Sequence, residues 1–294
     1  MDYFMEQVIN GLQLGLVYAL IALGYTMVYG IVKLINFAHG DVFMVGAFIG
    51  YFGFSSWGLP WPLAILVSAL CCACLGMLIE RIAYRPLRYA TRIVALISAI
   101  GVSFFLEYFC SLKFMFGPNY RVVQRPFDEV YWSIGGVTIS NIQVLIFCTA
   151  VCMLVGLQYL VMRTKMGAAM RTVSFDHDTA RLMGVNVDRT ISFTFGIGAA
   201  LAAVGGVLYA IAYPQIWTFM GIMPGLKAFT AAVLGGIGLI PGAMLGALIM
   251  GQAEVMTAAF ISSQLRDAIA FSILILVLLV RPCGILGKTQ PEKV

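Results

Sequence analysis

Three polar side chains interrupt the apolar sequence between residues 33 and 41. Asn36, His39 and Asp41 lie within six positions of one another, and an apolar segment flanks them on each side. Ionisable side chains at membrane depth are costly and commonly line a substrate or proton path. An Asn or Asp at a helix start can instead accept hydrogen bonds from free backbone amides. The pattern therefore leaves two interpretations open, a translocation path and a helix cap.

Other charged residues invite similar hypotheses. Glu107 lies well inside the apolar segment 93–112, where it would serve as a proton-relay acid or, more simply, as a carboxylate that reaches the outer headgroups or makes a satisfied polar contact. Glu254 and the adjacent pair Arg266 and Asp267 flank the last apolar segment. We interpret these three as charges at a membrane boundary.

Motifs for catalysis or nucleotide binding fail on spacing. The stretch GILGKT, residues 284–289, has two residues between its glycines, whereas a phosphate-binding loop needs four. The two histidines, His39 and His177, stand 138 positions apart and do not form a metal ligand set. The sequence contains neither a G-x-S-x-G elbow nor an H-E-x-x-H helix. We therefore predict no catalytic residue, no cofactor and no metal on this chain.

The elements that must position these residues are membrane helices. Of the 294 residues, 61% are hydrophobic and 11% are charged, whereas soluble domains carry roughly 25% charged residues. The apolar runs are unbroken and approach the ~20 residues that span a bilayer as a helix. Basic residues stand at the ends of these runs, so the net charge of +5 indicates orientation in the lipid bilayer and not nucleic-acid binding. The predicted fold class is an all-α polytopic membrane protein.

The distribution of arginines predicts the topology. Segment 80–92 carries four arginines against one acid, Glu80, which places it in the cytoplasm. Counting spans from there puts the N-terminus and the loop 113–140 outside, and the polar loop 163–190 in the cytoplasm. We expect a single transmembrane domain over 1–294, with about eight transmembrane helices and further short broken or re-entrant helices.

Two short apolar segments suggest broken helices. Residues 42–54 are short for a full span, and GGIGLIPG at 235–242 would break its helix near the middle of the bilayer. A Gly/Ala-striped helix, a polar kink and a short apolar piece occur at 8–54 and again, in the opposite direction, at 191–238. Such an inverted repeat is typical of transporters. Whether 42–54 and 226–238 span or re-enter stays open, as does the side of the C-terminus.

Five stretches carry a resemblance to one transporter family. They are NFAHGD (36–41), ERIAYRPLR (80–88), LISAIG (96–101), KAFTAAVLGGIGLIPGAMLGALI (227–249) and LILVLLVRPCGILG (274–287). Over nearly its whole length the chain resembles the LivH-type (BraD-type) permeases of bacterial high-affinity branched-chain amino acid ABC importers. The resemblance implies a multi-pass permease subunit of the inner membrane, not an enzyme, that moves Leu, Ile or Val by alternating access. It also implies a compact helix arrangement like that of vitamin B12-type importers.

The same resemblance implies several partners. They are a second, LivM-like permease, two ATPase subunits that hold ATP and Mg²⁺, and a periplasmic branched-chain amino acid-binding protein that sets most of the specificity. The ATPases would dock on a cytoplasmic coupling segment at 166–185. Its residues are Met166, Gly167, Ala168, Ala169, Arg171, Asp176, Asp178, Arg181, Leu182 and Gly184. The Glu-Ala-Ala pattern of other importers is absent, since Gly167-Ala168-Ala169 takes its place.

The resemblance places the substrate path between the two permeases. On this chain the path would follow Asn36, Phe37, His39, Asp41, Gly235, Gly236 and Gly238. The alternative is a stand-alone ion-coupled carrier for small apolar solutes that uses Glu107 and His39. Such a carrier would take up substrate without partners under a proton gradient.

Overall fold

Membrane-spanning helices make up most of the molecule. The computed structural model describes residues 2–88, 90–134 and 136–287. Within these ranges seven helices are long and apolar enough to cross a membrane, as expected for an all-α polytopic protein. They are α1 (Asp2–Val32), α3 (Trp61–Ile79), α4 (Arg92–Cys110), α5 (Asn141–Arg163), α8 (Val187–Ala212), α10 (Ile240–Phe260) and α11 (Arg266–Val280), the last counted with the turn η3 (Ser263–Leu265) that leads into it. The count differs from the expected eight because α2 (His39–Ser55) and α9 (Ile222–Gly235) are shorter and begin midway.

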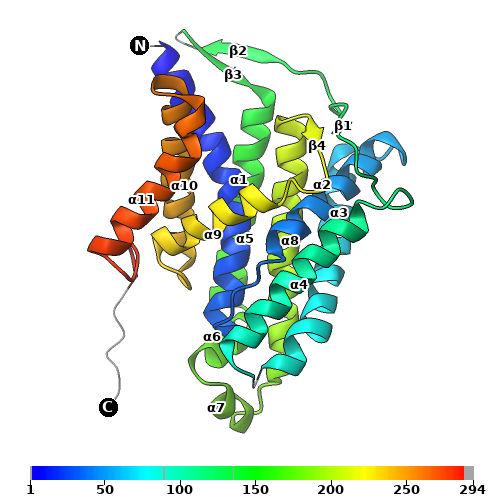
Figure 1. Cartoon of the computed structure of the whole chain (residues 1–294), viewed down its shortest axis with the longest axis vertical. Helices are drawn as coiled ribbons and strands as arrows, with labels where there is room; N and C mark the ends of the chain where they lie inside the picture. The colour runs from blue at the N-terminus through cyan, green and yellow to red at the C-terminus, as the bar shows by residue number, and fades with distance from the viewer. Residues whose placement is uncertain (1, 89, 135, 288–294) are drawn as a thin grey trace.

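The two ends of the helix bundle differ in structure (Figure 1). One end carries the start of α1 and a hairpin of β2 (Tyr131–Ile134) and β3 (Val137–Ser140). The opposite end carries the short helices α6 (Lys165–Phe175) and α7 (His177–Leu182). The arginine-rich turns η1 (Glu80–Tyr84) and η2 (Arg85–Leu87) follow α3 directly. Because positive charge favours the cytoplasm, we refer to the α7 end as the cytoplasmic end and to the hairpin end as the outer end.

Short strands organise the outer end, where the sequence pattern predicts only a loop. The chain 113–140 contributes the β2–β3 hairpin and β1 (Arg121–Val122), which pairs with β4 (Gln215–Ile216). The pairing joins two connections that are far apart in the sequence. Strands of two to four residues carry too few positions for an alternating pattern to be detected.

The helix α2 begins inside the bilayer. Its first residue, His39, lies beside Tyr25 with 4.7 Å between ring centroids, seven residues before α1 ends at Val32. At ~1.5 Å per residue that is roughly 10 Å above the cytoplasmic end of α1. The chain therefore climbs back through residues 33–38, and α2 returns to the outer end (Figure 1). Residues 33–55 thus cross together from the cytoplasmic end to the outer end, and α2 covers only the outer part of this crossing.

The helix α9 is the counterpart of α2 in the second half of the chain. It begins close to Gly40, since a Cβ on Gly225 would lie 2.8 Å from the Gly40 Cα, and it ends at Gly235. The break before α10 therefore does not lie near mid-bilayer, and that prediction was wrong. Gly238 in the break lies against Gly30, near the cytoplasmic end of α1.

The C-terminal segment explains why the chain can break at that level. The amides of Ile285 and Leu286 donate hydrogen bonds to the carbonyls of Leu234 and Gly235. These bonds satisfy carbonyls that the end of α9 leaves free. The segment after α11 therefore lies on the cytoplasmic side, together with α6 and α7.

The two halves form an inverted repeat, α1–α4 and α8–α11. α1 runs toward the cytoplasmic end and α8 runs away from it (Figure 1). α1 packs on α10 and α9, and α8 packs on α3 and α2, so each half makes the same contacts with the other. The halves meet where Gly24 touches Gly198 and Gly40 touches Gly221. The packing thus agrees with the repeat expected over 8–54 and 191–238 and extends it to the two helices that follow each copy.

Candidate functional site

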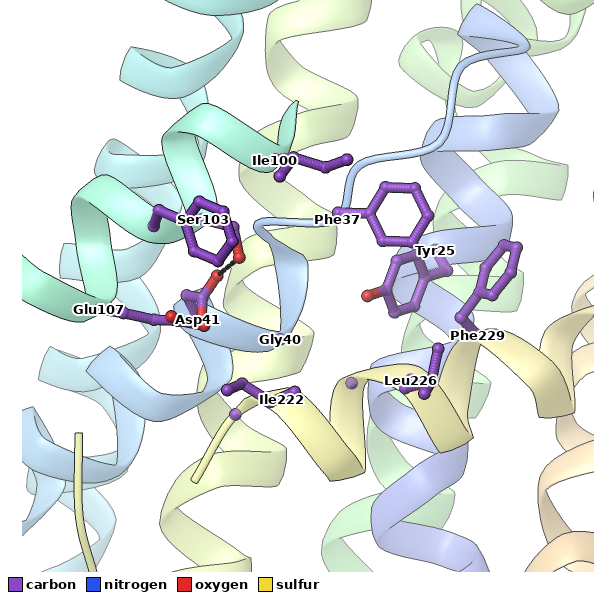
Figure 2. A pocket seen from close by; sticks show the side chains of 13 residues that line it. Tyr25, Phe37, Gly40, Asp41, Ile100, Ser103, Glu107, Ile222, Leu226 and Phe229 are labelled. Carbon is purple, nitrogen blue, oxygen red and sulfur yellow. Dashed lines mark hydrogen bonds between the residues drawn. The ribbon is translucent and has the colours of Figure 1, made fainter. Parts of the chain in front are cut away.

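A chamber opens at the point where the two half-helices meet. It has a volume of about 220 Å³ and lies between α1, α2, α4 and α9 (Figure 2). We call it the midplane chamber. Its lining residues are Tyr25, Phe37, Gly40, Asp41, Ile100, Ser103, Phe104, Glu107, Gly221, Ile222, Gly225, Leu226 and Phe229.

Glycines allow the two helix starts to approach each other at the chamber. A Cβ on Gly40 would lie 2.5 Å from the Gly221 carbonyl oxygen and 3.1 Å from the Gly225 Cα. Both starts place the positive ends of their backbone dipoles at the chamber. Discontinuous helices use such ends to attract anionic groups of a substrate near the bilayer midplane.

Two carboxylates lie in the same chamber. Asp41 is buried on the first turn of α2 and accepts a hydrogen bond of 2.5 Å from the Ser103 hydroxyl. Glu107 lies one turn further along α4 and points toward Asp41 (Figure 2). Residues four apart share one helix face, and this face of α4 is turned inward. Glu107 therefore does not reach the outer headgroups, and that interpretation was wrong.

The remaining chamber wall is apolar. Phe37, Phe229 and Leu226 form one part, and Ile100 and Phe104 of α4 contribute another. The chamber thus combines apolar surface, two carboxylates and two helix N-termini. This combination can bind a small zwitterion with an apolar side chain. In the described ranges no three His, Cys, Asp or Glu side chains converge as metal ligands would.

The structure brings together two of the predicted path residues, Phe37 and Asp41. Asn36 accepts a hydrogen bond of 3.0 Å from the Tyr84 hydroxyl, and the His39 side chain is directed at Gly24 of α1. The cap of α2 is Ala38, and no side chain caps this helix. The helix-cap interpretation was therefore wrong for this group.

The glycines predicted for the path lie elsewhere. Gly235 packs against Gly242, and Gly236 packs against the C-terminal segment at Gly284. Gly238 lines a smaller cavity of about 100 Å³ near the cytoplasmic end, together with Thr26 and Arg171. A path through these glycines stays a prediction.

Several chamber residues were missed from the sequence. Ser103 was missed, although it stands four residues before Glu107 in an apolar helix and this spacing could have paired the two. Gly221 and Gly225 were missed as well, although they also stand four apart and this spacing places small residues on one helix face. Tyr25 gave no signal, because an aromatic residue in a long apolar helix is ordinary packing.

The segment expected to couple to ATPases forms two capped helices. The Thr164 hydroxyl accepts a hydrogen bond from the Gly167 amide at the start of α6. The Asp176 carboxylate accepts hydrogen bonds from the amides of Asp178 and Thr179 at the start of α7. Together with the Thr179 hydroxyl, these bonds hold the pKa of Asp176 below its usual range. Each short helix therefore has a fixed start.

The residues of this segment divide between an inner and an exposed face. Gly167 and Ala180 are buried, whereas Arg171 is exposed as a residue although its guanidinium donates to the Val161 carbonyl. The other residues predicted for docking are half-buried or exposed: Met166, Ala168, Ala169, Asp176, Asp178, Arg181, Leu182 and Gly184. Three apolar side chains, Phe175, Leu182 and Met183, stand out into solvent at the tip. Phe175 and Met183 were missed, although an apolar residue in a polar loop is itself a signal.

The charges around the last helix are not boundary charges throughout. Glu254 is fully buried and accepts from the Tyr18 hydroxyl at 3.0 Å and from Lys227 Nζ at 2.8 Å. Arg266 lies 2.7 Å from the same carboxylate, and Asp267 lies 2.7 Å from Lys227 Nζ. The boundary interpretation was therefore wrong for Glu254, because Lys227 gives it a partner inside the bundle.

Comparison with known proteins gives consistent matches. Residues 7–278 match the family model described as branched-chain amino acid transport system, permease component. The chain is 44% identical over 306 residues to the high-affinity branched-chain amino acid transport system permease protein LivH of Escherichia coli K12, covering 99% of this chain and 98% of that protein. It is 45% identical over 302 residues to the corresponding protein BraD of Pseudomonas aeruginosa, with the same coverage. A probable LivH permease of Methanocaldococcus jannaschii is 28% identical over 91% of this chain and 88% of its own length.

No solved structure matches the chain. The expected likeness to vitamin B12-type importers stays a prediction.

Proposed function

Because the chain belongs to the family of permease components of branched-chain amino acid transport systems, we propose that it forms part of the membrane path of an ATP-driven importer of Leu, Ile and Val. It is a multi-pass inner-membrane protein and a transport subunit, not an enzyme. The observation that carries the substrate proposal is the midplane chamber.

The chamber matches the chemistry of a branched-chain amino acid. The carboxylates of Asp41 and Glu107 complement a substrate ammonium group, and the starts of α2 and α9 complement its carboxylate. Phe37, Phe229 and the other apolar residues offer contact to a branched side chain. We expect transient binding during alternating access, with selection made earlier by a periplasmic binding protein.

A second, related permease would complete the path. Phe104 of α4 and Leu226 of α9 line the midplane chamber and are exposed, so the chamber reaches the surface of the bundle beside these two helices. Lipid is a poor cover for buried acids and for non-helical backbone such as residues 33–38. A protein partner satisfies both requirements, and the LivM-like permease of the same system is the partner we propose.

Energy would come from two ATPase subunits that hold ATP and Mg²⁺. The apolar tip formed by Phe175, Leu182 and Met183 offers a small hydrophobic contact to such a subunit. Arg171 and Arg181 flank this tip and would contact acidic residues around it. The stretch GILGKT offers no nucleotide site by its spacing, and its Lys288 and Thr289 lie outside the described residues.

The test is reconstitution of the chain with its second permease, two ATPases and binding protein in liposomes. We expect labelled leucine to enter the liposomes only when ATP is present on the side of the membrane that carries the ATPases. We also expect the four subunit types to copurify. The charge reversal Arg181→Glu should lower uptake by about tenfold, while the reversal Arg163→Glu on the neighbouring end of α5 should not.

Uptake by this chain alone under a proton gradient would overturn the proposal in favour of an ion-coupled carrier. ATP hydrolysis and uptake that are unchanged by both Arg181→Glu and Leu182→Asp would overturn the docking assignment.

A further inference from the structure

A cluster of charged side chains joins the start of α8, which follows α7, to the connection between α3 and α4. Asp188 lies on the first turn of α8, six residues after α7 ends. Its carboxylate accepts from Arg85 at 2.6 Å and from Arg88 at 2.5 Å. Both arginines belong to the connection between α3 and α4, so the two cytoplasmic connections are tied together.

The same cluster is anchored in the interior of the bundle. Arg88 pairs with Glu80, whose side chain is fully buried, and Glu80 also accepts from the Ser192 hydroxyl one turn further along α8. A buried carboxylate must stay paired, since an uncompensated charge there is costly. Arg88 thus holds Glu80 and Asp188 at once, which makes the junction between α8 and the α3–α4 connection stiff.

The helix beyond this junction reaches the midplane chamber. α4 packs against η1 at its cytoplasmic end and against α2 further along. At the second place Ser103 donates to Asp41, and Glu107 lies beside it. A displacement of the α3–α4 connection therefore moves a helix that contributes a wall of the chamber.

We propose that Asp188, Arg85 and Arg88 are the residues that carry movement of α7 to α4 and so to the chamber. The inference rests on the ATPase docking proposed above and adds to it the route from the docking segment to the substrate path. Asp188 and its two arginines are positioning residues: they contact neither nucleotide nor amino acid.

The inverted repeat supplies a matched control at the opposite end of the bundle. Glu254, like Glu80, is a fully buried acid, and it accepts from Tyr18 of α1 as Glu80 accepts from Ser192 of α8. Asp267 is the second residue of α11, as Asp188 is of α8. Both aspartates pair with two cations, and their side chains are 44% and 40% exposed. No coupling helix adjoins Asp267.

The experiment compares Asp188→Asn with Asp267→Asn in the reconstituted transporter described above. Each variant removes one negative charge from a two-cation cluster. The measured quantity is the amount of leucine taken up per ATP hydrolysed. We expect Asp188→Asn to keep its ATP hydrolysis and to lower this ratio by about tenfold, whereas Asp267→Asn should keep the wild-type ratio.

A ratio that is equal in the two variants would overturn the inference, and so would a parallel loss of hydrolysis and uptake in Asp188→Asn. If Asp188→Asn does not assemble, Arg85→Gln replaces it, because Arg85 is half exposed and its loss leaves the Arg88–Glu80 pair intact. Arg85→Gln should lower the ratio by roughly threefold, and an unchanged ratio would count against the inference. A wild-type complex that shows no ATP-driven uptake would instead overturn the proposed function, and this inference with it.

Discussion

Lys227 and Glu254 form an ion pair inside a bundle of membrane helices. The Lys227 side chain is 2% exposed and that of Glu254 is 0% exposed, with 2.8 Å between them. Bringing two charges out of water is expensive, and only good geometry with further hydrogen bonds compensates for it. The Tyr18 hydroxyl and Arg266 supply those further bonds to Glu254. The pair therefore holds α9, α10 and α1 in one arrangement.

Removing one member of this pair should destabilise the protein more than removing both charges. We expect Lys227→Met to cost about 3 kcal/mol, the lower end of the range for breaking a buried pair, because Arg266 still faces Glu254. The double variant Lys227→Met with Glu254→Gln should recover part of that loss, since no buried anion remains. Thermal unfolding of the detergent-purified chain measures both. A double variant that unfolds below the single variant would refute this account.

The sequence identified the residues of the site more reliably than it identified the directions of their side chains. Asp41 and Phe37 were expected on the path and do line the midplane chamber. His39 was expected there with equal reason, yet its ring turns toward Gly24. For Glu107 the headgroups were one of the roles left open, because depth along a helix can be estimated from sequence, whereas the buried face cannot. Lys227 could not be paired with Glu254, since only tertiary packing brings α9 beside α10.

At the scale of elements, two half-helices define the chamber. α2 and α9 begin at the same depth from opposite directions, and Gly40 and Gly221 permit their contact. The sequence pattern predicted both short elements and the inverted repeat, because length and glycine content are local properties. It misplaced the break before α10, because the C-terminal segment that satisfies the free carbonyls there is distant in sequence.

A glycine-to-alanine substitution should have opposite effects on stability at Gly40 of α2 and at Gly101 of α4. Gly40→Ala places a methyl group 2.5 Å from the Gly221 carbonyl oxygen, and such overpacking costs about 1–3 kcal/mol. Gly101→Ala on α4 meets no atom within 4 Å and should gain up to ~1 kcal/mol in helix propensity. The melting temperature should therefore fall in the first variant and hold or rise in the second. Equal shifts in the two variants would show that the half-helices do not meet at Gly40.

At the scale of the whole molecule, the outer surface is not equivalent on all sides. α1 and α8 are almost entirely enclosed, whereas α4, α5 and α11 expose large apolar side chains. Exposed apolar residues are ordinary for a membrane protein, because lipid covers them. The side beside α4 and α9 differs, because the exposed residues Phe104 and Leu226 line the midplane chamber there, so the chamber with Asp41 and Glu107 reaches the surface. We expect a protein partner on that side, because lipid is a poor cover for buried acids.

Two phenylalanines distinguish a partner-covered side from a lipid-covered one. Phe104 on α4 is 56% exposed and lines the chamber, while Phe147 on α5 is 53% exposed and lies away from it. With a photoreactive benzoylphenylalanine in place of Phe104, illumination of the assembled transporter should join this chain to the second permease. The same side chain in place of Phe147 should give adducts with lipid and none with the permease. Both positions are apolar and similarly accessible, so reactivity alone does not separate them. Permease adducts from position 147 and none from position 104 would place the partner on the other side of the bundle. The two chamber carboxylates would then face lipid, an arrangement that is disfavoured because charge in the bilayer is costly.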